Sequence, residues 1–106
     1  MEKSKVSIYT FELNQGVSEE QLICASAQVD ALLLRIDGFM YRSLTRIDGG
    51  QWQDIMYWNS EAARARGNRI ESSPAFDAFI SLIDERTVSF QSNTIVTQVY
   101  PQMEVA

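Results

Sequence analysis

The chain has 106 residues and a net charge of −5, and this length fits one domain, which we expect to span residues 1–106. Its nine Lys and Arg residues are scattered, whereas a nucleic-acid-binding surface needs clustered basic side chains to replace phosphate counterions. The sequence contains no histidine, which excludes Ser-His-Asp chemistry, histidine metal ligands and an imidazole base. We therefore expect no nucleic-acid partner and no bound metal.

Cysteine content and hydropathy set the expected compartment. Cys24 is the only cysteine, so the chain has no internal disulfide. No apolar run approaches the roughly 18 residues of a membrane-spanning helix. Residues 1–5 lack the long apolar stretch of a signal peptide. These features lead us to expect a cytoplasmic protein without a membrane partner.

A strand and a helix are predicted first. Residues 5–13 are rich in β-branched and aromatic types and predict a strand. Ser18 followed by Gln21 matches a capping box, in which each side chain binds the other residue's backbone N–H. Apolar residues at helical spacing follow, up to Ile36, and predict a helix that closes at Asp37-Gly38.

A β-hairpin is predicted next. Residues 39–47 and 51–58 both have the alternation and composition of strands. Between them, Asp48-Gly49-Gly50 can supply the positive φ angles of a tight turn.

The second helical segment is predicted in two pieces. Asn59-Ser60-Glu61 provides a helix cap, and the helix is interrupted near Gly67-Asn68. Ser73-Pro74 predicts a second start, because proline is favoured at the first helical position. An apolar stripe follows and the helix is expected to close at Asp84-Glu85-Arg86; the stripe consists of Phe76, Phe79, Ile80 and Ile83.

The last predicted element is a strand over residues 87–100. It is longer than the usual five or six residues, and its alternation weakens around residues 91–93. We expect a bulge or bend at that point.

The order strand, helix, strand, strand, helix, strand is the ferredoxin-like βαββαβ arrangement of the α+β class. Its antiparallel sheet carries both helices on one face. The first and third predicted strands are apolar on both faces, whereas a water-exposed face should be polar. Each large apolar side chain left in water forfeits about 1.5 to 3 kcal/mol. A homodimer that covers the free face is the simplest solution.

Six short motifs between residues 4 and 100 point together to one family, and the stretch between Gly38 and Ala63 is the most telling. They are Gly38-Phe39, Arg42, Gly50-Gln51-Trp52, Asp54-Ile55-Met56-Tyr57-Trp58, Ser60-Glu61-Ala62-Ala63 and Ser73-Pro74-Ala75-Phe76. With these residues the chain resembles the antibiotic biosynthesis monooxygenase-like superfamily. The resemblance implies a small protein that forms a dimeric α+β barrel. The superfamily includes cofactor-free monooxygenases that act on polyphenolic substrates, and also haem-degrading enzymes.

The haem-degrading branch uses an asparagine on the first strand, a tryptophan in the second-helix segment and a histidine soon after the position of Phe76. This chain has no asparagine before Asn14, no tryptophan after Trp58 and no histidine. We therefore expect neither haem degradation nor a cofactor.

The monooxygenase branch uses asparagine, tryptophan and tyrosine beside an aromatic substrate, and Tyr57, Trp58 and Asn59 loosely match that set. Trp58 and Asn59 are thus candidate catalytic residues. Each has a structural alternative: Trp58 can close the core at the strand end, and Asn59 or Ser60 can cap the following helix.

Asp54 is the third candidate catalytic residue. It shares a strand face with large apolar side chains, where a carboxylate can serve as a base. The alternative is an ion pair with Arg42 or Arg46 of the neighbouring strand, which is a common arrangement in sheets.

The candidate substrate-binding residues are Tyr9, Tyr41, Arg42 and Phe76. We expect a pocket between the sheet and its helices. One hypothesis is a cofactor-independent monooxygenase that oxidises an aromatic or quinone-like small molecule. The alternative is a non-catalytic small-molecule binding or sensing protein on the same scaffold.

Overall fold

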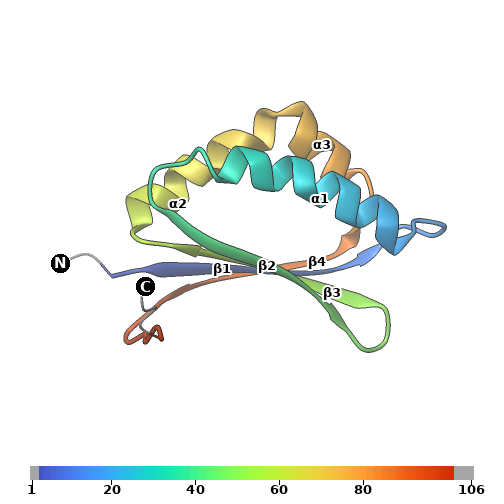
Figure 1. The fold of residues 1–106 in the computed structure, drawn as a ribbon. Coiled ribbons are helices and arrows are strands. Elements are labelled where there is room, and N and C mark those ends of the chain that lie inside the picture. The colour runs from blue at the N-terminus through green and yellow to red at the C-terminus, as the bar shows by residue number, and fades with distance from the viewer. Residues whose placement is uncertain (1–2, 102–106) are drawn as a thin grey trace.

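A computed structural model describes residues 3–101. Four antiparallel strands form one sheet in the order β2-β3-β1-β4; they are β1 (Lys5–Leu13), β2 (Phe39–Ile47), β3 (Gln51–Trp58) and β4 (Ile83–Thr94). One face of the sheet is covered by α1 (Glu19–Leu33), α2 (Glu61–Gly67), the 3₁₀ segment η1 (Asn68–Ser72) and α3 (Pro74–Ile80) (Figure 1). The predicted α+β, ferredoxin-like fold is confirmed.

Helix α1 begins as predicted and ends earlier. Gln21 N donates to Ser18 Oγ at 3.2 Å, and Ser18 N donates to Gln21 Oε1 at 2.8 Å, so the capping box is confirmed. The prediction that the helix continues to Asp37-Gly38 is wrong, because it ends at Leu33. Ile36 N bonds to the carbonyl three residues before it, which makes this segment a tight turn and places Ile36 outside the helical stripe.

The hairpin of β2 and β3 has the predicted bounds. Gly49 and Gly50 both have a φ of 89°, a conformation that favours glycine. This turn fixes which residues of the two strands face each other, and Leu44 thereby lies opposite Asp54.

The predictions for the last strand and the preceding helix end are wrong in position. Strand β4 covers Ile83–Thr94 instead of residues 87–100, and α3 ends at Ile80. Ile83 is therefore a buried strand residue and not part of the helical stripe. Asn14 explains the early start of β4, because its backbone N donates to Leu82 O and its side chain donates to Ile83 O.

The irregularity of β4 lies nearer its beginning than residues 91–93. The register against β1 shifts between the pairs Glu12–Asp84 and Thr10–Ser89. Asp84 explains the shift, because its carbonyl accepts from Thr87 Oγ1 at 2.6 Å and its carboxylate accepts from the backbone N of Arg86. These local hydrogen bonds hold the extra residues of the bulge.

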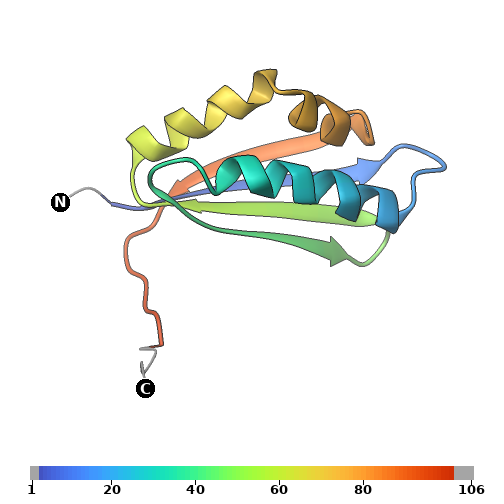
Figure 2. The ribbon, with the colours of Figure 1, turned by 45° about the horizontal axis from the view of Figure 1, so that its top comes forward.

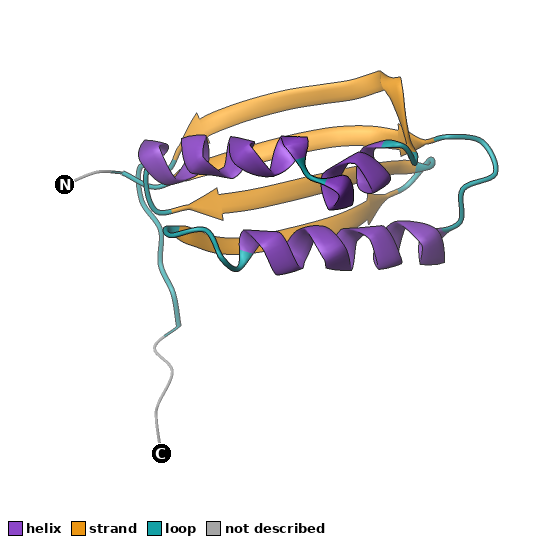
Figure 3. Cartoon of the chain, turned by 90° about the horizontal axis from the view of Figure 1, so that it is seen from above, coloured by secondary structure: helices purple, strands orange, loops and turns teal. Residues whose placement is uncertain are grey.

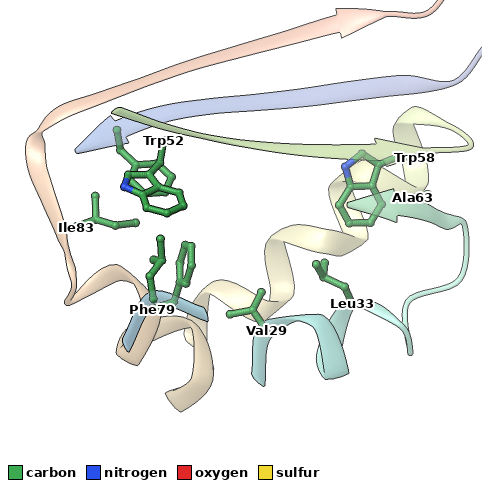
Figure 4. Packing of buried hydrophobic residues seen from close by; sticks show 9 residues of the cluster. Val29, Leu33, Trp52, Trp58, Ala63, Phe79 and Ile83 are labelled. Carbon is green, nitrogen blue, oxygen red and sulfur yellow. The ribbon is translucent and has the colours of Figure 1, made fainter. Parts of the chain in front are cut away.

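The hydrophobic core fills the space between the sheet and the helix layer (Figure 4). The largest fully buried side chains are Phe11, Leu22 and Leu33. Within residues 3–101, no helix lies over the opposite sheet face (Figures 1 and 2). That face carries Val6 and Ile8 of β1 beside their β3 partners Tyr57 and Ile55, so apolar side chains occupy both faces, as predicted.

Candidate functional site

A cavity of about 120 Å³ lies between the sheet and the helix layer. Residues from β1 and β3 form one wall, among them Tyr9, Phe11, Asp54 and Trp58; α2, η1 and α3 form the other with Gly67, Ile70, Phe76 and Phe79. The pocket predicted between the sheet and its helices is therefore present. Its walls are mainly apolar, with a small number of polar groups, as is typical of small-molecule sites.

Trp58 lies at the end of β3 and points into the space between the two layers (Figure 4). Only 3% of the residue is exposed, and its ring packs edge-to-face on Phe39 with the centroids 5.4 Å apart. Its indole Nε1 is buried and has no hydrogen-bond partner among the described residues. A buried N–H without a partner costs about 1 to 3 kcal/mol. Trp58 thus closes the core, lines the cavity and carries a buried donor without a partner among the described residues.

Tyr9 reaches the cavity from the middle of β1. Its ring packs against Phe90 of β4 with the centroids 4.7 Å apart. Burial raises the pKa of Tyr9, and the negative charges of Glu71 and Asp54 raise it further. The side chain therefore stays a neutral phenol at physiological pH and can donate a hydrogen bond.

Asp54 lines the cavity from the centre of β3 and is 4% exposed. Arg42 holds both of its oxygens: Nε donates to Oδ1 at 2.9 Å and Nη2 donates to Oδ2 at 2.7 Å. The predicted pairing with Arg42 is confirmed, whereas Arg46 pairs with Glu19 at 2.5 Å. Because both oxygens of Asp54 accept charged hydrogen bonds, the carboxylate is a held structural group and not a free base.

Arg42 lies behind Asp54 and connects the sheet to α1. Its Nη1 donates to Ser26 Oγ at 2.8 Å and to Asp30 Oδ1 at 2.7 Å, and its guanidinium carbon lies 5.2 Å from the Phe79 ring centroid. Burial lowers the pKa of Arg42, but the hydrogen bonds to Asp54 and Asp30 outweigh this effect and raise it. Arg42 is absent from the cavity wall among the described residues, so it acts there only through Asp54.

The structure brings some candidate residues together and separates others. Phe76 lines the cavity beside Tyr9, Asp54 and Trp58. Tyr41 does not line it, because the register pairs it with Tyr57 on the uncovered sheet face, where Tyr41 is 59% exposed.

Asn59 is also outside the cavity wall. It is exposed in the connection after β3, where its backbone N donates to Gly38 O at 2.9 Å. Ser60 caps α2, since its Oγ accepts from Ala63 N at 3.1 Å.

Gly67 and Glu71 line the cavity and are absent from the candidate residues of the sequence. The sequence contained an indication for Gly67, because a glycine inside a helical pattern marks a close approach or an interruption. Gly67 ends α2 against the ring of Trp58. The sequence contained no such indication for Glu71, since glutamate side chains are mostly exposed in any folded protein.

Two classes of site are not found in residues 3–101. No group of three or more His, Cys, Asp or Glu side chains there could hold a metal ion. No helix in this range is long and apolar enough to cross a membrane.

Solved structures share this fold. A variant of SnoaB, a cofactor-independent oxygenase from Streptomyces nogalater, aligns with a TM-score of 0.76 and 18% identity over 94% of this chain and 99% of that chain. A protein of unknown function from Nitrosomonas europaea, NE2512, aligns with a TM-score of 0.74 and 13% identity over 95% and 97%. A candidate antibiotic biosynthesis monooxygenase from Caulobacter crescentus aligns with a TM-score of 0.72 and 12% identity over 91% and 92%.

No protein-family model and no curated protein matches the sequence. The similarity to the solved structures, at identities below 20%, is a similarity of fold.

Proposed function

We propose that this chain, which has the fold of the antibiotic biosynthesis monooxygenase-like superfamily, catalyses a cofactor-independent oxygenation of an aromatic or quinone-like small molecule. The observation that carries the proposal is Trp58, which lines an apolar cavity and whose buried Nε1 has no hydrogen-bond partner among the described residues. A ligand oxygen that accepts this hydrogen bond would remove the cost of the unpaired donor. The neutral hydroxyl of Tyr9 is a second donor on the same wall.

The two donors suit a substrate oxygen that becomes anionic. Hydrogen bonds aimed at a developing oxyanion in a dry cavity favour the ionised form of a phenol or enol. The ionised substrate supplies the electrons for dioxygen. For an activated methylene, as in an anthrone, the CH₂ group and O₂ give a carbonyl and one water, so one oxygen atom enters the product and the other leaves as water.

The state of Asp54 limits what this chain contributes to proton transfer. Since Arg42 engages both carboxylate oxygens, Asp54 forms part of the cavity wall and does not act as a free base. The substrate then ionises with the help of hydrogen bonds from Trp58 and Tyr9. The same observation favours the second candidate function, a non-catalytic small-molecule binding or sensing protein.

Oxygen uptake with a panel of hydroquinones and anthrones tests the first function. We expect protein-dependent consumption of one O₂ for each molecule of the substrate that is oxidised, with loss of this activity in Trp58→Phe. Trp52→Phe is the matched control, because Trp52 is also a buried β3 tryptophan but is outside the cavity wall. Tight binding without oxygen uptake would establish the binding function instead, and absence of binding would reject both.

We also propose a homodimer formed through the uncovered sheet face. The support is the group of half-buried apolar side chains at its centre, Ile8, Ile55 and Tyr57, with the exposed ring of Tyr41 beside them. Such a face behaves like half of a core, which is the character of obligate interfaces. The cavity lies on the other side of the sheet, so each subunit would keep its own site.

A further inference from the structure

The opening of the cavity is identified by which of its lining residues are exposed. Asn68 and Glu71 of η1 and Val88 of β4 are the exposed members of the described lining, whereas Phe11 and Trp58 are buried. The mouth therefore lies between η1 and the edge strand β4. Figure 3 shows that the helix layer leaves the strand at this edge of the sheet uncovered.

The size of the cavity limits the part of a ligand that fits inside. Its volume is about 120 Å³, and an engineered apolar cavity of about 150 Å³ holds one benzene molecule. One aromatic ring beside Trp58 thus fills the space. Any further part of the ligand must leave through the mouth.

The surface just outside the mouth is apolar. Val88 is 43% exposed and Phe90 is 50% exposed. The register pairs Phe90 with Tyr9, which places both rings on the helix side of the sheet. Because Tyr9 and Val88 both line the cavity, this surface is continuous with its wall.

We propose that the ligand is a single-ring phenol, hydroquinone or quinone with an apolar chain. The ring lies in the cavity beside Trp58, and the chain leaves between η1 and β4 and covers Val88 and Phe90. This inference rests on the proposed function and adds the class of molecule.

The test is calorimetric titration of the full chain carrying Cys24→Ser, which removes the exposed thiol that quinones alkylate. The ligands are methyl-, butyl- and hexyl-substituted para-benzoquinone, which is the oxidised form and does not turn over. A fully buried methylene improves affinity about fourfold. If the protein covers the apolar chain of the ligand on one side only, the affinity should rise about twofold for each added methylene.

Three variants test where the apolar chain of the ligand lies. In Phe90→Thr the gain with chain length should fall to near zero, while the affinity for methyl-benzoquinone is kept. In Val88→Thr the gain with chain length should also fall. Threonine is suited to strands, so β4 should persist. Ile23→Thr is the control: Ile23 is 54% exposed on α1 and is outside the cavity wall, so the full gain should remain.

The outcomes separate this inference from the proposed function. Binding of methyl-benzoquinone with no gain for longer chains, or an equal gain in Phe90→Thr, would overturn the inference and leave the proposed site intact. Equally tight binding of a three-ring anthrone would also overturn it. A change of oligomeric state in Phe90→Thr, with no gain in the wild type, would assign this surface to a second copy of the chain. If neither a quinone nor an anthrone binds, both proposals fail.

Discussion

Gly67 of α2 lies so close to Trp58 that a Cβ atom at this position would be 2.7 Å from Cζ2 of the indole. The absence of a side chain therefore lets the helix close over the ring that carries the unused N–H donor. The same contact sets the position of Trp58 in the cavity wall, because Gly67 also lines the cavity.

Gly67→Ala should destabilise the protein by about 1 to 3 kcal/mol, because the new methyl group overpacks the indole. In an ordinary helix position the same change is stabilising by about 0.5 to 1 kcal/mol. Urea unfolding gives the free energy, and near-ultraviolet circular dichroism reports the displaced ring. Adding Trp58→Phe should recover part of the loss, since the smaller ring makes room. A Gly67→Ala protein as stable as the wild type would contradict this packing.

Trp58→Phe should keep most of the packing and remove the indole N–H. We expect the affinity for methyl-benzoquinone to fall about threefold to tenfold, the usual value of one hydrogen bond. Trp52→Phe should leave the affinity unchanged, because Trp52 does not line the cavity. If Trp58→Phe lowers only thermal stability, then Trp58 is a core residue and the ligand lies elsewhere.

The local patterns of the sequence predicted the elements whose ends are set by local chemistry. The capping box at Ser18 and the glycine turn at Gly49-Gly50 each depend on residues a few positions apart, and both were confirmed. The beginning of β4 was not predictable in this way. It depends on hydrogen bonds from Asn14, about seventy positions away in the chain.

The candidate site also divides into features that local sequence patterns predict and features that they do not. Strand parity predicted that Asp54 and Trp58 share a face and that Arg42 can reach Asp54. The sequence left open whether Asn59 or Ser60 caps α2 and whether Tyr41 faces the cavity. The identity of the cap depends on the residue at which α2 begins. The orientation of Tyr41 depends on which sheet face the helices cover, and that is decided by tertiary packing.

Asp54→Asn should destabilise the protein by about 3 to 5 kcal/mol, because it leaves the buried charge of Arg42 without its main partner. Replacing the pair together, with Arg42→Met and Asp54→Leu, should cost less than the single change, since no unpaired charge remains. Urea unfolding measures both. Glu19→Gln breaks the exposed pair with Arg46 and is the control, with an expected cost of at most about 1 kcal/mol. An equally small cost for Asp54→Asn would show that the pair is solvated.

Tyr9 should make the folding stability of the protein fall at alkaline pH. Its pKa is raised in the folded state, mainly by burial, so above pH 10 the folded chain keeps a proton that the unfolded chain loses. Folding stability is then fully present below the ordinary tyrosine pKa of about 10 and falls as the pH rises through the folded value. Tyr9→Phe should flatten this fall, and the tyrosinate absorbance should lose its latest-titrating step. If Tyr9→Phe instead removes a titration step at the ordinary tyrosine pKa, Tyr9 is solvated in the folded protein and the prediction is contradicted.

The uncovered sheet face gives the last prediction. Ile55→Asp puts a charge at the centre of the proposed dimer interface, where it would be buried without a partner. We expect dimerisation to weaken about a hundredfold or more, which sedimentation at micromolar concentration can measure. Ile23→Asp adds the same charge on α1, where Ile23 is already exposed, and should leave the dimer intact. Because half of an obligate interface is unstable alone, the Ile55→Asp protein should also unfold at a lower temperature. A wild-type chain that sediments as a stable folded monomer at that concentration would contradict the proposed assembly.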